Sequence, residues 1–115
     1  MTLQRYKPDA RLAEAVVVNG LIFTAGQVPT NTDADAQAQV ADVLAQIDAI
    51  LADLGSDKTR IVDATIFLAS LDDYAALNAA WDAWITPGQV PARATVQAKL
   101  ADPAWKVEIK VVTAC

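Results

Sequence analysis

The fold is decided by the stretch Val16-Val17-Val18-Asn19-Gly20-Leu21-Ile22-Phe23-Thr24. Two short runs of β-branched and large apolar residues flank an Asn-Gly pair, and both residues of that pair tolerate a positive φ angle. The stretch therefore predicts two antiparallel strands joined by a two-residue turn. The next residues, Gly26-Gln27-Val28-Pro29, are expected to end the second strand in a loop.

Two helices separated by a strand are expected after this hairpin. Thr32 or Asp33 can cap the start of the first helix, and Gly55 can end it in the left-handed conformation. Ser70 can cap the second helix, and Pro87-Gly88 breaks it. From the spacing of their apolar residues, the expected elements are a helix at 33–54, a strand at 61–68 and a helix at 72–85.

The last third of the chain predicts two more strands, at 93–100 and 105–113, which we expect to pair as a hairpin through residues 101–104. In that register, strand alternation places Arg93 and Glu108 on one face. The expected order is β-β-α-β-α-β-β, with both helices packed on one face of a mixed, mostly antiparallel sheet. This pattern is typical of an α+β fold.

The composition limits the class of function. A chain of 115 residues, with nine basic and fourteen acidic side chains and a net charge of −5, is expected to form a single domain over residues 1–115 that binds neither nucleic acid nor a membrane. Apolar residues make up 54% of the chain. Either the core is large, or some apolar surface is buried against other subunits.

The chain has no His, and its single Cys is the last residue, Cys115. Ser-His-Asp and Cys-His catalysis are therefore excluded, together with the commonest metal ligand. The N-terminus has no hydrophobic run of signal-peptide length, and no run approaches the length of a membrane span. We expect a reduced, soluble, cytoplasmic protein.

Four residues are candidates for a binding or catalytic site. Arg93 can bind a carboxylate through two parallel hydrogen bonds, and Glu108 can hold or activate a water. Asn78 falls inside the apolar stripe of the second helix, and Gly26 allows a ligand to approach the backbone. Each has a structural alternative. Arg93 and Glu108 could simply lie on a solvated sheet face, Asn78 could be a satisfied helix amide, and Gly26 could belong to a plain turn.

Taken together, these segments resemble the Rid family (reactive intermediate deaminase, also called the YjgF family) over nearly the whole chain. The Gly-Gln-x-Pro and Pro-Ala-Arg elements, in this order and with Val-Glu-Ile near the end, are fairly specific. Residues 61–84, with Trp81-Asp82-Ala83-Trp84, look closest to the YoaB-like branch. The matching segments are Asn19 to Pro29, Leu54-Gly55, Ile61 to Leu68, Tyr74 with Asn78, Pro91 to Val96, and Val107-Glu108-Ile109.

The resemblance implies a chorismate-mutase-like fold and a homotrimer that binds small carboxylate substrates in clefts between subunits. It also implies the hydrolysis of reactive enamines and imines derived from amino acids, such as 2-aminoacrylate, to 2-oxo acids and ammonia, without a cofactor or a metal. A non-catalytic trimeric binder of small carboxylates, such as 2-oxo acids, is the alternative.

The resemblance also assigns roles to single residues. Arg93 matches the carboxylate-binding Arg, and Glu108 matches the Glu associated with the catalytic water. Asn78 and Gly26 match residues of the cleft. Two positions depart from the family pattern. Thr95 stands where the deaminases commonly have Cys and is expected to contact substrate, and Leu12 stands where they often have Tyr.

Overall fold

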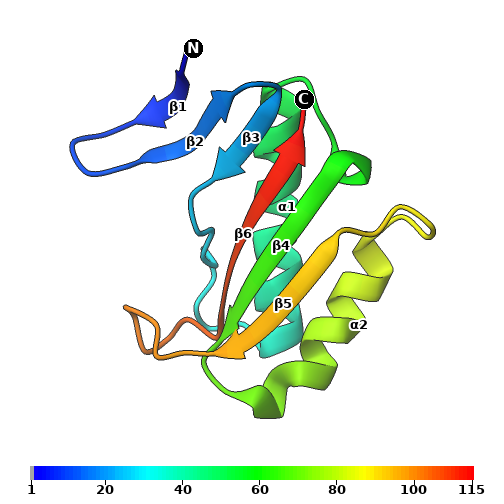
Figure 1. Ribbon diagram of the computed structural model, residues 1–115. Helices are drawn as coiled ribbons and strands as arrows, with labels where there is room; N and C mark the ends of the chain where they lie inside the picture. Colours follow the sequence, from blue (N-terminus) through cyan, green and yellow to red (C-terminus); the bar gives the residue numbers. More distant parts are fainter. Residues whose placement is uncertain (1) are drawn as a thin grey trace.

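The computed structural model describes residues 2–115, in which one mixed sheet carries two helices on one of its faces (Figure 1). The strand order is β1-β2-β3-β6-β4-β5, and every neighbouring pair is antiparallel except β4 with β5. The α+β class is therefore confirmed. The strands are β1 (Gln4–Pro8), β2 (Ala13–Val18), β3 (Leu21–Thr24), β4 (Ile61–Leu68), β5 (Ala92–Gln97) and β6 (Val107–Ala114).

Helices α1 (Ala36–Asp53) and α2 (Tyr74–Trp84) lie side by side behind the sheet (Figure 1). The first helix begins three residues later than expected, and neither proposed cap is used. Asp35 is the cap instead, because its carboxylate accepts a hydrogen bond from the backbone N–H of Ala38 at 2.9 Å. Gly55 follows the helix with a φ angle of +78°, as expected. The start expected for the second helix is a 3₁₀ turn, Leu71–Asp73.

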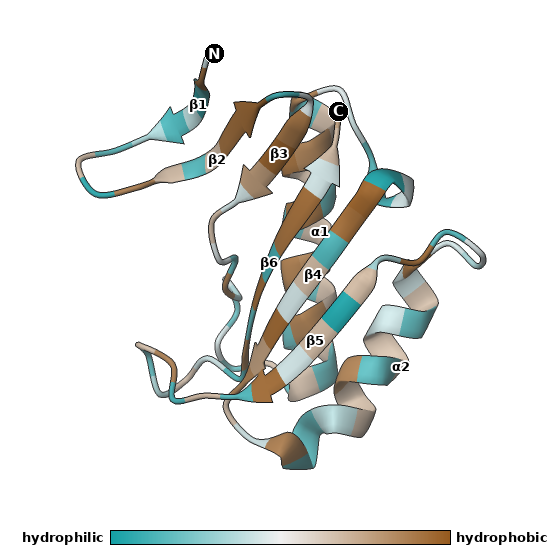
Figure 2. Ribbon diagram, in the orientation of Figure 1, coloured by the Kyte–Doolittle hydropathy of each residue, from teal (hydrophilic) through white to brown (hydrophobic). Residues whose placement is uncertain are grey.

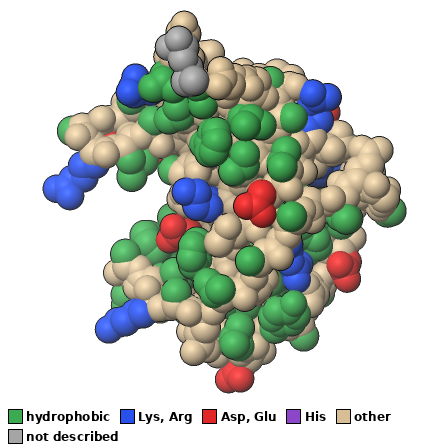
Figure 3. Space-filling model, viewed as in Figure 1, with side chains coloured by type: hydrophobic (Ala, Val, Ile, Leu, Met, Phe, Trp, Pro, Cys, Tyr) green, Lys and Arg blue, Asp and Glu red, His purple; other side chains and the backbone are tan. Residues whose placement is uncertain are grey.

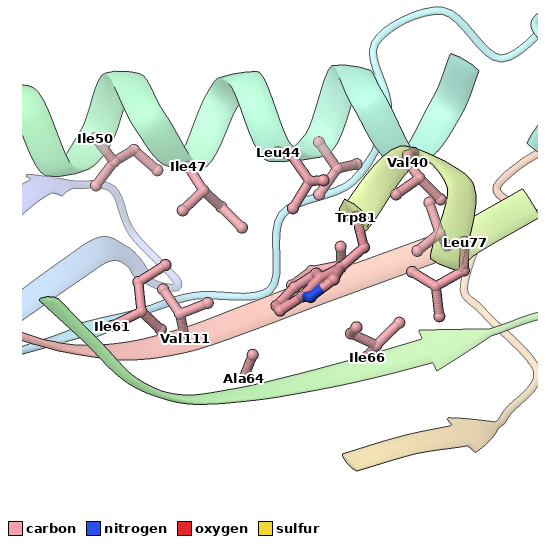
Figure 4. Close-up of a cluster of buried hydrophobic side chains, with 14 of the residues drawn as sticks. Val40, Leu44, Ile47, Ile50, Ile61, Ala64, Ile66, Leu77, Trp81 and Val111 are labelled. Atoms are coloured by element: carbon pink, nitrogen blue, oxygen red, sulfur yellow. The ribbon is translucent and has the colours of Figure 1, made fainter. Parts of the chain in front are cut away.

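The core lies between the helices and the sheet (Figure 4). Hydrophobic residues, coloured brown, make up much of β4, β6 and α1 (Figure 2). The side chains of α1 point down onto β4 and β6, while Leu77 and Trp81 enter from α2 (Figure 4). Burial of each large aliphatic side chain stabilises the fold by about 1.5–3 kcal/mol. The buried core residues labelled in that view are Val40, Leu44, Ile47, Ile50, Ile61, Ala64, Ile66, Leu77, Trp81 and Val111.

The first hairpin has the expected register, in which Val18 pairs with Leu21. Its turn residues Asn19 and Gly20 have φ angles of +51° and +74°, the left-handed values that an Asn-Gly turn provides. The structure contains one strand that was not predicted, β1, which precedes this hairpin in the chain and pairs with β2 at the sheet edge. The sequence of β1 does not alternate apolar with polar residues, because most of the strand is exposed at the sheet edge.

The expected hairpin between the last two strands is wrong. β4 lies between them, paired in parallel with β5 and antiparallel with β6. The connection from β4 to β5 runs through α2, which is how parallel neighbours are joined. A register shift in β4 between Ile61 and Asp63 buries Ile61 and leaves Val62 51% exposed.

Candidate active site

Arg93 lies on the edge strand β5, opposite the buried Ala64 of β4, so its side chain points toward α2. Its Nη2 atom donates a hydrogen bond to Oδ1 of Asn78 at 2.9 Å and a longer one to Oη of Tyr74 at 3.3 Å. The polar Asn78 inside the apolar stripe of α2 is therefore explained, because it fixes the guanidinium at the helix–sheet boundary.

Two aromatic rings flank the same guanidinium. Its central carbon lies 5.1 Å from the centre of the Trp81 ring and 6.0 Å from that of Tyr74. Trp81 is itself fixed, because it is buried and its ring lies 5.4 Å from that of Trp84, whose indole N–H donates to Asp48 at 2.9 Å. Cation–π contacts of this kind hold the cation without consuming its hydrogen-bond donors.

Thr95 lies two residues after Arg93 on the same face, opposite Ile66. Its hydroxyl oxygen is buried and has no hydrogen-bond partner among the described residues. Buried polar atoms are nearly always satisfied. The Thr113 hydroxyl, which lies in the core on β6, is likewise buried without a partner among the described residues, so an unpaired hydroxyl of this kind does not by itself mark a ligand site.

Glu108 and Gly26 form a second cluster. Glu108 pairs with Phe67 of β4, which in turn pairs with Val96 of β5, on the face that carries no helix. A Cβ atom at position 26 would lie 2.0 Å from Oε2 of Glu108, so only glycine leaves room for that carboxylate. The backbone of the next residue, Gln27, is tied to β6 by hydrogen bonds in both directions with Ile109.

The prediction that Arg93 and Glu108 share a face is wrong. It assumed that their strands pair directly, whereas β4 separates them. In the observed register, Arg93 of β5 pairs with Ala64 of β4, which in turn pairs with Val111 of β6, and all three side chains lie on the helix side of the sheet. Glu108 lies on the opposite side. The structure thus brings Arg93 together with Asn78 and Glu108 together with Gly26, and it places these two pairs on opposite faces of the sheet.

Tyr74 and Trp81 were not predicted as neighbours of Arg93, although both stand in segments that carry the family resemblance. Their spacing held the signal, because residues 74, 78 and 81 fall on one side of a helix. Leu12 is 51% exposed in the turn between β1 and β2. As a leucine, it provides no hydroxyl group at the position where the resemblance leads us to expect a tyrosine.

The loop that follows Gly26 is fastened to α1 by Asp42. The backbone N–H of Thr30 donates to this carboxylate at 2.7 Å, and the amide of Gln46 donates to it at 3.2 Å and to the Val28 carbonyl at 2.9 Å. Partial burial raises the pKa of Asp42, but these hydrogen bonds outweigh it, so the pKa lies below its ordinary value.

Asp42→Asn is expected to lower the stability by about 1 kcal/mol, a shift of roughly 5 °C in Tm, because the ionised acceptor is lost. Since folding lowers the pKa of Asp42, its contribution is complete above about pH 4 and is lost as the pH falls further. Melting curves of both proteins at pH 7 and pH 3 test this. A gap in Tm that is as large at pH 3 as at pH 7 would contradict it.

Within residues 2–115, no helix is both long and apolar enough to cross a membrane, and no group of three or more acidic, His or Cys side chains could hold a metal ion. The two clusters therefore offer an arginine held by an amide and flanked by aromatic rings, and a carboxylate that lies against a glycine.

The family model described as Endoribonuclease L-PSP matches residues 2–115. The curated protein YoaB of Escherichia coli strain K12, of the RutC family, is 53% identical over 114 residues, which cover 99% of each chain. The chain belongs to the Rid (YjgF) family. Its resemblance to the YoaB-like branch agrees with this identity.

Two solved structures closely match the fold of this chain. The YjgF family member NMB1025 from Neisseria meningitidis has a TM-score of 0.94 at 50% identity, over 99% of this chain and 95% of that one. A putative translation initiation inhibitor from Salmonella typhimurium has a TM-score of 0.92 at 49% identity, over 99% and 98% of the two chains. Both structures therefore share the overall fold of this chain.

Proposed function

We propose that this Rid protein hydrolyses reactive enamine and imine intermediates derived from amino acids, such as 2-aminoacrylate, to 2-oxo acids and ammonia. The observation that carries the proposal is the setting of Arg93. Its guanidinium is held by Asn78 at 2.9 Å and lies 5.1 Å from the buried Trp81 ring, which leaves N–H donors for a small carboxylate.

The proposed chemistry needs only positioning and a water. Arg93 binds the carboxylate of the imino acid and so fixes the electrophilic carbon. Glu108 takes a proton from a water as the water oxygen adds to that carbon, and Glu108 then delivers this proton to the imine nitrogen. The resulting carbinolamine loses ammonia and leaves the 2-oxo acid. Water supplies the oxygen of the product, so neither a covalent enzyme intermediate nor a redox partner is required.

The two halves of this site must meet between copies of the chain. Arg93 and Glu108 lie on opposite faces of one sheet, so the Glu108 of a neighbouring subunit would have to approach Arg93. The helix-free face suits such an assembly, since hydrophobic side chains gather on it around a few charged ones (Figure 3). Phe23 and Val96 on that face are 41% and 43% exposed. A homotrimer, as the family resemblance implies, would cover them.

The test generates 2-imino acids with an amino-acid oxidase and follows their decay at neutral pH. With this protein present, the decay and the release of ammonia should accelerate in proportion to its concentration. Equal decay with and without the protein would rule out the proposed activity.

The separation of Arg93 from Glu108 also favours a second function, a non-catalytic trimeric binder of small carboxylates such as 2-oxo acids. The Arg93 half of the site could bind a carboxylate without any help from Glu108. In that case 2-oxobutyrate would stabilise the protein against heat while imine decay remained unchanged.

Glu108→Gln separates the two functions, because it keeps the shape of the side chain and removes the base. We expect imine hydrolysis to fall by about a hundredfold or more and the affinity for 2-oxobutyrate to change less than threefold. Steady-state kinetics and calorimetry measure the two quantities. Unchanged hydrolysis would remove Glu108 from the mechanism.

The description of the matching family model includes endoribonuclease activity. The charge of this chain does not suit RNA, because binding to phosphates depends on Lys and Arg, and the net charge is −5. Arg93 is also half-buried, and its guanidinium is held against α2 by the hydrogen bond to Asn78. We therefore place the substrate among small carboxylates.

A further inference from the structure

Tyr74 occupies the approach to Arg93. It is the first residue of α2, it is 43% exposed, and its hydroxyl accepts a hydrogen bond from Arg93 Nη2 at 3.3 Å. Asn78, one turn further along the helix, accepts from the same nitrogen at 2.9 Å in a more buried position. The Nη2 nitrogen thus has two hydrogen-bond acceptors. Asn78 is the closer and more buried of the two, and Tyr74 is the more distant and more exposed.

These two bonds use both hydrogens of Nη2. A guanidinium can bind a carboxylate through two parallel N–H groups, and either such pair of donors includes one hydrogen of Nη2. A ligand carboxylate that binds Arg93 in this way must therefore displace Asn78 or Tyr74. The hydrogen bond to Tyr74 is the longer and the more exposed of the two, so we expect the carboxylate to replace Tyr74 and not Asn78.

We propose that Tyr74 exchanges this contact on binding and becomes a direct ligand of the substrate. The carboxylate replaces the phenol oxygen on Nη2, and the phenol then donates its own O–H to that carboxylate. Asn78 keeps its hydrogen bond throughout. The inference rests on the proposed function and narrows its substrates to small 2-imino and 2-oxo acids with an ionised carboxylate, which receives N–H donors from Arg93 and one O–H donor from Tyr74.

The chemistry favours this exchange. A phenol in contact with a guanidinium can only accept, so its proton is not used in that contact. A hydrogen bond to an ionised carboxylate is stronger than one between neutral groups. The Tyr74 ring lies 6.0 Å from the guanidinium carbon and can stay beside it while the hydroxyl turns. Without a ligand, the same hydroxyl satisfies one of the donors of Arg93.

Tyr74→Phe tests the inference, because it removes only the hydroxyl and keeps the ring. We expect the Kd for 2-oxobutyrate, measured by calorimetry, to rise about tenfold. The KM for the imino acid should rise in parallel, while kcat stays within twofold, since the lost bond serves the carboxylate and not the attacking water. Tyr74 is well exposed, so the variant should melt close to the wild type.

Tyr6→Phe is the matched control. It removes the hydroxyl of the other tyrosine, which bonds to Asp53 at the end of α1 and lies on β1, at the opposite edge of the sheet from Arg93, and it should leave the Kd for 2-oxobutyrate unchanged. If Tyr74→Phe binds 2-oxobutyrate as tightly as the wild type, or more tightly, Tyr74 contacts Arg93 only when no ligand is bound. That result would refute the inference and leave the proposed function unaffected. If the wild type neither binds 2-oxobutyrate nor hydrolyses imines, both fall together.

Discussion

Arg93→Ala is expected to lower kcat/KM for imino acids by at least about a hundredfold, because a hydrogen-bonded charge pair with the substrate is lost. Arg93→Lys should recover only part of the loss. It keeps the positive charge but cannot present two parallel donors. Steady-state kinetics with imino acids generated by an amino-acid oxidase would measure both variants. An Arg93→Ala protein with wild-type kinetics would contradict the proposed site.

The fold should survive this change. Arg93 lies on an edge strand and is only half-buried, so its removal mainly leaves Asn78 without a partner. We expect a loss of about 1 kcal/mol in stability, which a melting curve would show as a shift of several degrees. A large loss of activity with a small shift in Tm would separate a binding role from a structural one.

Mixed assemblies provide a sharper test of the site between subunits. Arg93→Ala and Glu108→Gln should each be inactive alone, because every site then lacks one half. When the two variants are co-expressed and assemble at random, about a quarter of the sites combine an intact Arg93 with an intact Glu108 of a neighbour. Activity near a quarter of the wild type would support the shared site. No recovery in assemblies shown to contain both chains would refute it.

The first hairpin could be predicted because all of its information is local. Asn19 and Gly20 favour the turn, and the register follows from the turn. The pairing of the last two strands could not be predicted in the same way. Their short sequence separation suggested a hairpin, but β4 competes for both partners and lies between them. Such long-range competition leaves no mark in the spacing of neighbouring residues.

The same limit applied to the site. Sequence patterns and the family resemblance singled out Arg93 and Asn78 separately, and their hydrogen bond appears only when β5 lies beside α2. Tyr74 is an aromatic residue of the same helix, yet 43% of it is exposed. A residue that is aromatic and also carries a hydroxyl fits both a core and a binding site, so the pattern of the helix alone could not separate the two roles.

Gly26→Ala is expected to lower kcat nearly as much as removal of the Glu108 carboxylate does, with little loss of stability. The new methyl group would lie 2.0 Å from Oε2 and 2.8 Å from Cδ of Glu108, which cannot both remain in place. Gln27 is tied to β6 through Ile109, so the backbone resists movement more than the carboxylate does. The half-buried Glu108 side chain should therefore turn away, and the water would lose its base.

A pair of double variants tests this cause. In a Glu108→Ala background the clash is absent, so Gly26→Ala should add almost no further loss of kcat. In the wild-type background the same change should lower kcat by about a hundredfold, while Tm falls by only a few degrees. If Gly26→Ala lowers kcat equally in both backgrounds, the glycine acts through the ligand or the loop backbone and not through the position of Glu108.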